Sequence, residues 1–150
     1  MTLPASGTGR RHAVLCVDDN AEIAAALELL FSRLPDFEWI GWLPAADRLV
    51  AEVLERRPHL VLVDIDLPGT DPFRAIEELA ERDPEVRAVM FSGHVRPELV
   101  DRALGAGAWG YVSKNDGEEE LLSVLRQVAA GEFALSSEAG RMHLQERRDP

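Results

Sequence analysis

Four short apolar runs in the sequence each end in side chains that can bind a cation, donate a proton or attack an electrophile. These side chains are Asp18 and Asp19, then Asp64, then Ser92, and finally Lys114. Three carboxylates brought close together repel one another unless a cation such as Mg²⁺ neutralises them. With a lysine and a hydroxyl beside them, they would form a phosphoryl-transfer site with an aspartate carboxylate as the nucleophile.

The elements that must bring these side chains together alternate regularly along the chain. Apolar runs predict strands at 13–17, 37–43, 60–63, 86–91 and 109–112. Apolar residues at helical spacing predict helices at 20–33, 45–56, 71–82, 97–104 and 118–130. Strict alternation predicts an α/β fold with a parallel sheet covered by helices on both faces. The carboxyl ends of parallel strands share one edge, where ligands bind, so we expect the five side chains to meet there.

Each of these residues also has an ordinary structural interpretation. Asp18 and Asp19 taken alone are typical helix caps, and Asp64 could cap the turn at Pro68-Gly69. A single serine or lysine after a strand is usually a solvated loop residue. Chance would rarely place all five at matching strand ends, so we favour a shared site.

Composition limits the class of protein. The 150 residues suffice for one domain, and the net charge of −11 argues against non-specific nucleic-acid binding. The single cysteine, Cys16, allows no internal disulfide and lies in an apolar run, so we expect it in the core. The sequence has no membrane-length apolar stretch and no signal-peptide pattern. We therefore expect a cytoplasmic protein without membrane contact.

The order of these motifs resembles the receiver domain of bacterial two-component response regulators. The matching segments are Val-Asp-Asp-Asn at 17–20, Val-Asp-Ile-Asp-Leu-Pro-Gly at 63–69, Phe-Ser-Gly at 91–93 and Gly-Tyr-Val-Ser-Lys at 110–114. The resemblance spans residues 11–131. It leaves 1–10 as a flexible N-terminal lead-in and 132–150 as a linker-like tail, expected to be disordered or marginally helical.

The resemblance implies a flavodoxin-like (βα)5 fold with strand order 2-1-3-4-5. It implies that Asp64 accepts a phosphoryl group from a sensor histidine kinase, a phosphotransfer protein or a small phosphodonor. The implied site uses Asp18, Asp19, Asp64 and the backbone carbonyl of Asp66 for Mg²⁺, Lys114 for the phosphoryl oxygens, and Ser92 and Tyr111 as the switch pair. Such a protein is not an enzyme beyond phosphorylating and dephosphorylating itself.

Three residues near the implied site depart from the family pattern or vary within it. Asn115 follows the lysine where many members have proline, so we expect a different loop geometry there. Asp66 and His94 each lie two residues after a site residue, near the expected path of an attacking water. His94 is also interpretable as an exposed residue at the start of a helix.

The segment 132–138 resembles the linker that joins receivers to a helix-turn-helix domain, yet only 12 residues follow Glu138. We expect a stand-alone receiver that switches a downstream protein partner or a homodimer and does not itself bind nucleic acid. The alternative is a receiver fragment of a helix-turn-helix transcription regulator. A receiver that binds its partner regardless of phosphate is another, and a haloacid-dehalogenase-type phosphatase, suggested by Asp64-Ile65-Asp66, is the least favoured.

Overall fold

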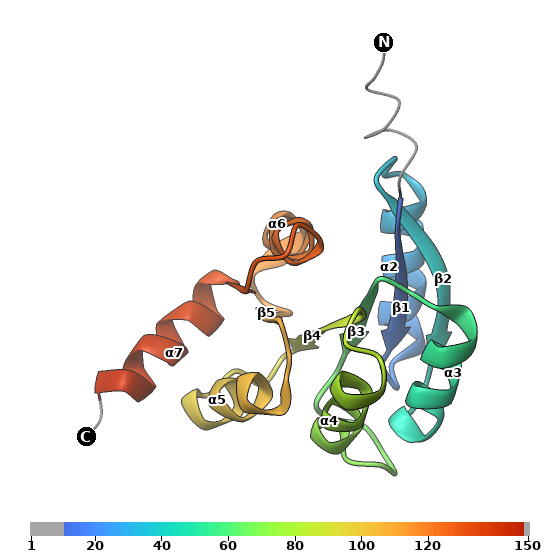
Figure 1. Cartoon of the computed structure of the whole chain (residues 1–150). Helices are drawn as coiled ribbons and strands as arrows, with labels where there is room; N and C mark the ends of the chain where they lie inside the picture. The colour runs from blue at the N-terminus through green and yellow to red at the C-terminus, as the bar shows by residue number, and fades with distance from the viewer. Residues whose placement is uncertain (1–10, 149–150) are drawn as a thin grey trace.

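A six-stranded parallel sheet forms the centre of the molecule (Figure 1). The structure is a computed structural model that describes residues 11–148. The strands are β1 (His12–Val17), β2 (Phe37–Leu43), β3 (Leu60–Val63), β4 (Arg87–Ser92), β5 (Gly110–Ser113) and β6 (Ala134–Leu135). Their spatial order is β2-β1-β3-β4-β5-β6, and every neighbouring pair is parallel. The predicted order 2-1-3-4-5 is confirmed, and β6 extends it. The predicted lead-in 1–10 lies outside the described residues.

Helices cover both faces of the sheet, as predicted. Helices α2 (Ala21–Ser32) and α6 (Gly117–Ala129) pack on one face. A 3₁₀ turn η1 (Ala46–Arg48), α3 (Leu49–Arg56), α4 (Pro72–Arg82) and α5 (Pro97–Ala106) pack on the other. The sheet thus separates two apolar cores and lies between two helical layers.

Strand β3 is buried on both faces because it lies at the centre of the sheet. Val61 and Val63 face the core under α3, α4 and α5, whereas Leu60 and Leu62 face the core under α2 and α6. None of the four is more than 1% exposed. This is the continuous apolar pattern of a central parallel strand, and it leads directly into Asp64. Cys16 is buried in the core under α2 and α6, as expected.

The helices that follow β1 and β3 each begin at a side-chain cap beyond the predicted site residues. Asn20 caps α2, and its side-chain oxygen accepts hydrogen bonds from the backbone N–H groups of Glu22 and Ile23 at 2.9 and 3.2 Å. Asp71 caps α4 in the same way through the N–H of Phe73 at 3.0 Å, with Pro72 in the first turn. These caps fix where the two helices begin, whereas Asp18 and Asp64 lie at the sheet edge because each directly follows its strand.

The end of α5 differs from the sequence prediction. The predicted helix stopped at Leu104 with Gly105 as its terminator, but the helix continues to Ala106. Gly107, with φ of 110°, ends it in the left-handed conformation that glycine adopts without strain. Two glycines lie close together here, and only the second has the backbone angle of a helix end.

The C-terminal segment forms more regular structure than the predicted disordered or marginally helical tail. After β6 the chain forms α7 (Ser137–Arg148), which lies beside α5 (Figure 1). Ala139 is fully buried and Met142 packs against the same core as α5. Ser136 Oγ accepts a hydrogen bond from the N–H of Ser113 at 3.0 Å. The segment therefore packs on the receiver fold from Ser136 to Met142.

Within residues 11–148, no helix combines the length and the apolar character needed to cross a membrane.

Candidate functional site

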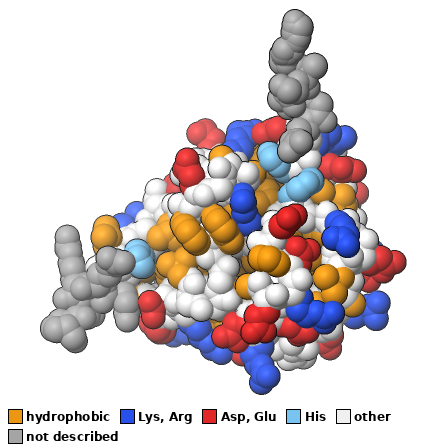
Figure 2. Space-filling model, in the orientation of Figure 1, with side chains coloured by type: hydrophobic (Ala, Val, Ile, Leu, Met, Phe, Trp, Pro, Cys, Tyr) orange, Lys and Arg blue, Asp and Glu red, His pale blue; other side chains and the backbone are white. Residues whose placement is uncertain are grey.

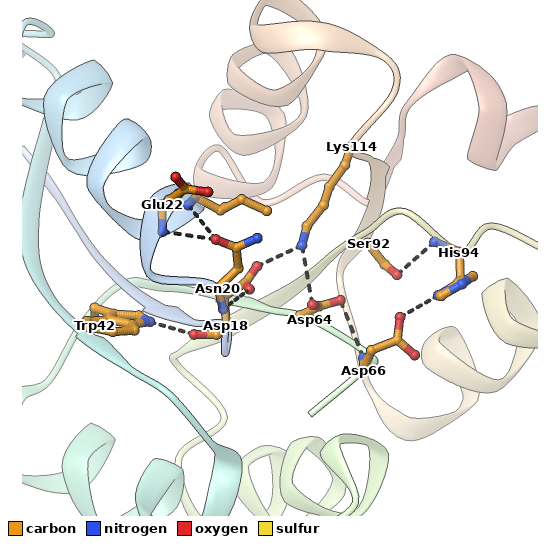
Figure 3. Close-up of polar contacts among 10 residues, drawn as sticks. Asp18, Asn20, Glu22, Trp42, Asp64, Asp66, Ser92, His94 and Lys114 are labelled. Atoms are coloured by element: carbon orange, nitrogen blue, oxygen red, sulfur yellow. Dashed lines mark hydrogen bonds and ion pairs between the residues drawn. The ribbon is translucent and has the colours of Figure 1, made fainter. Parts of the chain in front are cut away.

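The acidic cluster lies where β1 and β3 end at the carboxyl edge of the sheet (Figure 3). Asp18 is 1% exposed and Asp64 is 6% exposed, whereas Asp19 is exposed. Ligand oxygens of the three residues lie within 4.8 Å of one another. The sequence prediction that these three acids meet at one point is therefore correct.

Lys114 extends from the end of β5 between the two buried carboxylates. Its Nζ donates to Asp18 Oδ2 at 2.8 Å and to Asp64 Oδ2 at 3.2 Å. Helix α6 begins three residues later, so the lysine projects from a short loop over the sheet edge. Its ammonium group supplies one positive charge against three acidic side chains, which leaves the cluster net negative.

Burial and charge act on the ionisation of these groups. Burial raises the pKa of Asp64 and the charge of Asp18 raises it further, while Lys114 acts in the opposite direction. Burial lowers the pKa of Lys114, but its hydrogen bonds and its attraction to Asp18 and Asp64 outweigh that effect, so the net pKa is raised. The lysine therefore stays charged at neutral pH.

The cluster fits a hard divalent cation by the chemistry of its donors. Mg²⁺ binds through carboxylate oxygens and keeps several waters, and the exposed Asp19 leaves the cluster open to solvent on one side. Asp64 Oδ1 also accepts a hydrogen bond from the N–H of Asp66 at 3.4 Å, so the Asp66 backbone borders the same site. Asp18, Asp19 and Asp64 are the side chains that would hold the ion.

Ser92 is the last residue of β4, the strand that pairs with β3 and so lies next to the strand leading into Asp64. Ser92 is fully buried, and its Oγ accepts the N–H of His94 at 3.0 Å. Tyr111, on β5, is also fully buried, and its hydroxyl donates to the backbone carbonyl of His94 at 2.5 Å. Burial, together with the charge of Asp64, raises the pKa of Tyr111, so its hydroxyl stays protonated and available as a donor. The Tyr111 ring occupies an inward position.

Two contacts at this edge were not predicted from the sequence. His94 Nδ1 hydrogen-bonds to Asp66 Oδ2 and joins the loops after β3 and β4, as Figure 3 shows. Trp42 Nε1 donates to the backbone carbonyl of Asp18 at 2.5 Å. Both contacts depend on loop or strand geometry. For the contact between His94 and Asp66, the only signal in the sequence was that each residue lies two positions after a predicted site residue.

The loop after Lys114 forms a turn without proline. The N–H of Asn115 donates to Ser113 Oγ at 3.0 Å, and the N–H of Asp116 donates to the Ser113 carbonyl at 3.1 Å. Ser113 Oγ in turn donates to Glu138 Oε1 of α7 at 2.5 Å. Ser113 thus orders the loop that follows Lys114 and links it to the C-terminal helix.

Comparison with known proteins agrees with this geometry. The family model of the response regulator receiver domain matches residues 14–126. The nitrate/nitrite response regulator protein NarL of Escherichia coli K12 is 32% identical over 123 residues, which are 82% of this chain and 57% of NarL. The transcriptional activator protein ExaE of Pseudomonas putida is 33% identical over 123 residues, 79% of this chain and 55% of ExaE. The chain thus spans just over half the length of these curated relatives.

Solved structures share the fold. A LuxR-family two-component response regulator from an Aurantimonas species superposes with a TM-score of 0.87 at 25% identity, covering 93% of this chain and 99% of that one. The isolated REC domain of RcsB from Salmonella enterica has a TM-score of 0.81 at 15% identity over 89% of this chain and 99% of its own, a likeness of fold alone. The family match covers most of the chain and includes every residue of the acidic cluster, so this chain belongs to the response regulator receiver domain family.

Proposed function

We propose that this chain is the phosphoacceptor of a two-component signalling pathway, in which Asp64 takes a phosphoryl group in the presence of Mg²⁺. The observation that carries the proposal is the position of Asp64, which is buried beside two further carboxylates and 3.2 Å from the ammonium group of Lys114. A carboxylate held among a lysine and cation-binding oxygens is arranged for attack on phosphorus.

The step transfers a phosphoryl group between two proteins, or from a small phosphodonor. A carboxylate oxygen of Asp64 attacks phosphorus, the bond from phosphorus to the donor's leaving atom breaks, and an acyl phosphate forms on Asp64. When the donor is a phosphohistidine of a sensor kinase or phosphotransfer protein, the imidazole nitrogen keeps the bonding electron pair. Bound Mg²⁺ would supply charge neutralisation at the phosphoryl oxygens. Lys114 would release Asp64 and contact one of those oxygens.

The proposed output is a change in protein contacts read by a partner protein or a second copy of the chain. Ser92 would turn toward the phosphoryl oxygens, and Tyr111 would hold the loop after β4 through its bond to the His94 carbonyl. A net charge of −11 supports a protein partner over nucleic acid. Figure 2 likewise shows lysine and arginine side chains scattered among acidic ones on the face drawn.

Intact-mass measurement after incubation with Mg²⁺ and a small phosphodonor tests the proposal. We expect a single phosphate-sized gain that is absent from Asp64→Asn and from wild type in EDTA. Asp101→Asn, which replaces an exposed aspartate on α5, should gain the phosphate as wild type does. No gain in wild type, or the same gain in Asp64→Asn, would contradict the assignment.

The same samples test the phosphatase alternative. Asp64 follows the third strand in chain order, whereas the dehalogenase signature follows the first. We expect no multiple-turnover release of phosphate from small phosphoesters, measured as free phosphate against time. Continuous release that requires Asp64 would favour that alternative.

A further inference from the structure

The second strand contains one residue too many for its pairing with β1. Trp39 lies opposite Val14 and Gly41 lies opposite Leu15, so Ile40 has no partner in the register. This is a β-bulge, and it reverses the side of the sheet that each later residue of β2 faces. One of the residues that this reversal affects is Trp42, which follows Gly41.

The bulge brings Trp42 to the α2 side of the sheet. Trp42 lies opposite Cys16, which packs in the core under α2 and α6. With an unbroken register it would lie opposite Val17, which packs in the other core. The α2 side is also where the chain leaves β1 through Asp18 and Asn20, so the indole meets that loop (Figure 3).

The bulge is held in place by α3. Arg56 Nη1 donates to the carbonyl of Ile40 at 3.0 Å, and Arg56 Nε pairs with Glu52 Oε1 at 2.7 Å. A Cβ at position 41 would collide with the Arg56 guanidinium, so glycine leaves room for this contact. Side-chain hydrogen bonding thus satisfies the carbonyl of the extra residue, as a built bulge requires.

Four hydrogen bonds fix Asp18, and Trp42 makes the one on its carbonyl. The Asp18 N–H donates to the Leu43 carbonyl at 3.0 Å, and Asp18 Oδ1 accepts the N–H of Asn20 at 2.9 Å. Asp18 Oδ2 accepts from Lys114. The Asp18 carbonyl, which accepts from Trp42 Nε1, belongs to the peptide that joins Asp18 to Asp19. Its orientation sets the direction in which both carboxylates leave the backbone.

We propose that Trp42 is a positioning residue for the Mg²⁺ ligands, acting through its Nε1–H on the peptide between Asp18 and Asp19. The inference rests on the proposed use of Mg²⁺ at this site. Trp42 is 38% exposed, so packing alone does not account for a large aromatic side chain whose polar atom points at the acidic loop. Losing a single neutral hydrogen bond of this kind should weaken Mg²⁺ binding about three- to tenfold.

Nuclear magnetic resonance can test this directly because the chain has three tryptophans, Trp39, Trp42 and Trp109. In a Mg²⁺ titration of wild type, we expect the Trp42 indole signal to shift with the same midpoint as the Asn20 amide, which reports on Asp18. The Trp109 indole should stay fixed. Trp42→Phe removes the donor and keeps an aromatic ring, and it should raise the Mg²⁺ dissociation constant about three- to tenfold.

Trp39→Phe is the matched control, because Trp39 lies on the same strand and stacks on Phe31 instead. Trp39→Phe should leave the Mg²⁺ affinity unchanged even if it lowers thermal stability as much as Trp42→Phe does. Wild type that does not respond to Mg²⁺ would overturn the proposed metal site. Wild type that binds Mg²⁺ while the Trp42 indole signal stays fixed, or while Trp42→Phe binds as tightly, would overturn only the role of Trp42. If Trp42→Phe does not fold, the wild-type titration decides alone.

Discussion

At Asp64, burial and the neighbouring lysine act on one carboxyl in opposite directions, and burial prevails. The side chain is 6% exposed, burial is the largest cause of its raised pKa, and Asp18 adds to the shift. An ionised carboxylate in this position is held at a cost to stability, which is common at functional sites because the group serves chemistry rather than packing. The cost becomes measurable when the charge is removed.

We expect Asp64→Asn to be more stable than wild type by about 1 kcal/mol at pH 7 in EDTA. A carboxyl whose folded pKa exceeds its unfolded value of 3.8 binds more protons when folded than when unfolded. Stability therefore falls as pH rises from 3.8 through the raised folded pKa. The difference between variant and wild type should therefore be small below pH 3.8 and grow as pH rises through the raised pKa. Urea unfolding across a pH series measures it, and a difference independent of pH would contradict this account.

Tyr111 offers a second residue-level prediction, because its hydroxyl is the donor to the backbone carbonyl of His94. Tyr111→Phe keeps the ring and removes that donor, so we expect a loss of about 1 kcal/mol in the free energy of unfolding. The loop after β4 should also exchange amide hydrogens faster at His94. Unchanged stability and unchanged exchange would mean that water replaces the hydroxyl without cost.

The sequence predicted the ionisable site residues but not all of their contacts. Asp18, Asp64 and Lys114 could be found because each directly follows a strand, and parallel strands end at one edge. The pair Asp66–His94 could not be found, since it depends on how two loops fold toward each other. Trp42 was hidden for a different reason, because a one-residue bulge changes which face a side chain takes and leaves only a glycine as a sign.

Among the elements, the five strand–helix units could be read from the sequence because each has a strong local pattern. The apolar runs of β1 and β3 are continuous, and in the helices apolar residues recur with a period of about 3.6 residues. Strand β6 has two residues, too few for any periodicity. Helix α7 has a glycine in its interior and few apolar residues, and its docking depends on β5 and α5. Tertiary packing rather than local propensity determines such elements.

Gly110 is the residue that lets β6 approach β5. A Cβ there would lie 2.7 Å from the Ala134 carbonyl oxygen and 3.2 Å from Val124 Cγ1. We expect Gly110→Ala to cost about 1–3 kcal/mol and to speed amide exchange at Ala134 and Ser136, whose N–H groups bond to the Trp109 and Tyr111 carbonyls. Differential scanning calorimetry and hydrogen exchange measure the two effects.

Gly105→Ala is the control for this prediction. Gly105 lies inside α5 with nothing within 4 Å of its would-be Cβ, so alanine should stabilise the helix by up to about 1 kcal/mol. Equal effects of the two substitutions would show that close approach of β6 is not what Gly110 provides.

For the whole molecule, cations can act on the negative charge in two ways, by screening the net charge of −11 at long range and by binding locally to the acidic cluster. Acidic side chains outnumber basic ones by 27 to 16, so the folded chain repels itself, and any salt should relieve that repulsion by screening. Specific binding of Mg²⁺ to Asp18, Asp19 and Asp64 is a separate, local effect. Thermal unfolding in MgCl₂ reports screening and specific binding together, so the experiment needs a control salt that only screens.

We expect MgCl₂ to stabilise wild type more than NaCl of equal ionic strength. At ten times its dissociation constant the ion should add about 1.4 kcal/mol, or roughly 3–5 °C in the unfolding temperature. Asp19→Asn removes one ligand from an exposed position, where the fold should tolerate the change. That variant should keep the response to NaCl and lose most of the excess due to Mg²⁺. If NaCl stabilises wild type as much as MgCl₂ does, both salts act only by screening charge and the cluster does not bind Mg²⁺. The proposed Mg²⁺ requirement for phosphorylation of Asp64 would then be wrong.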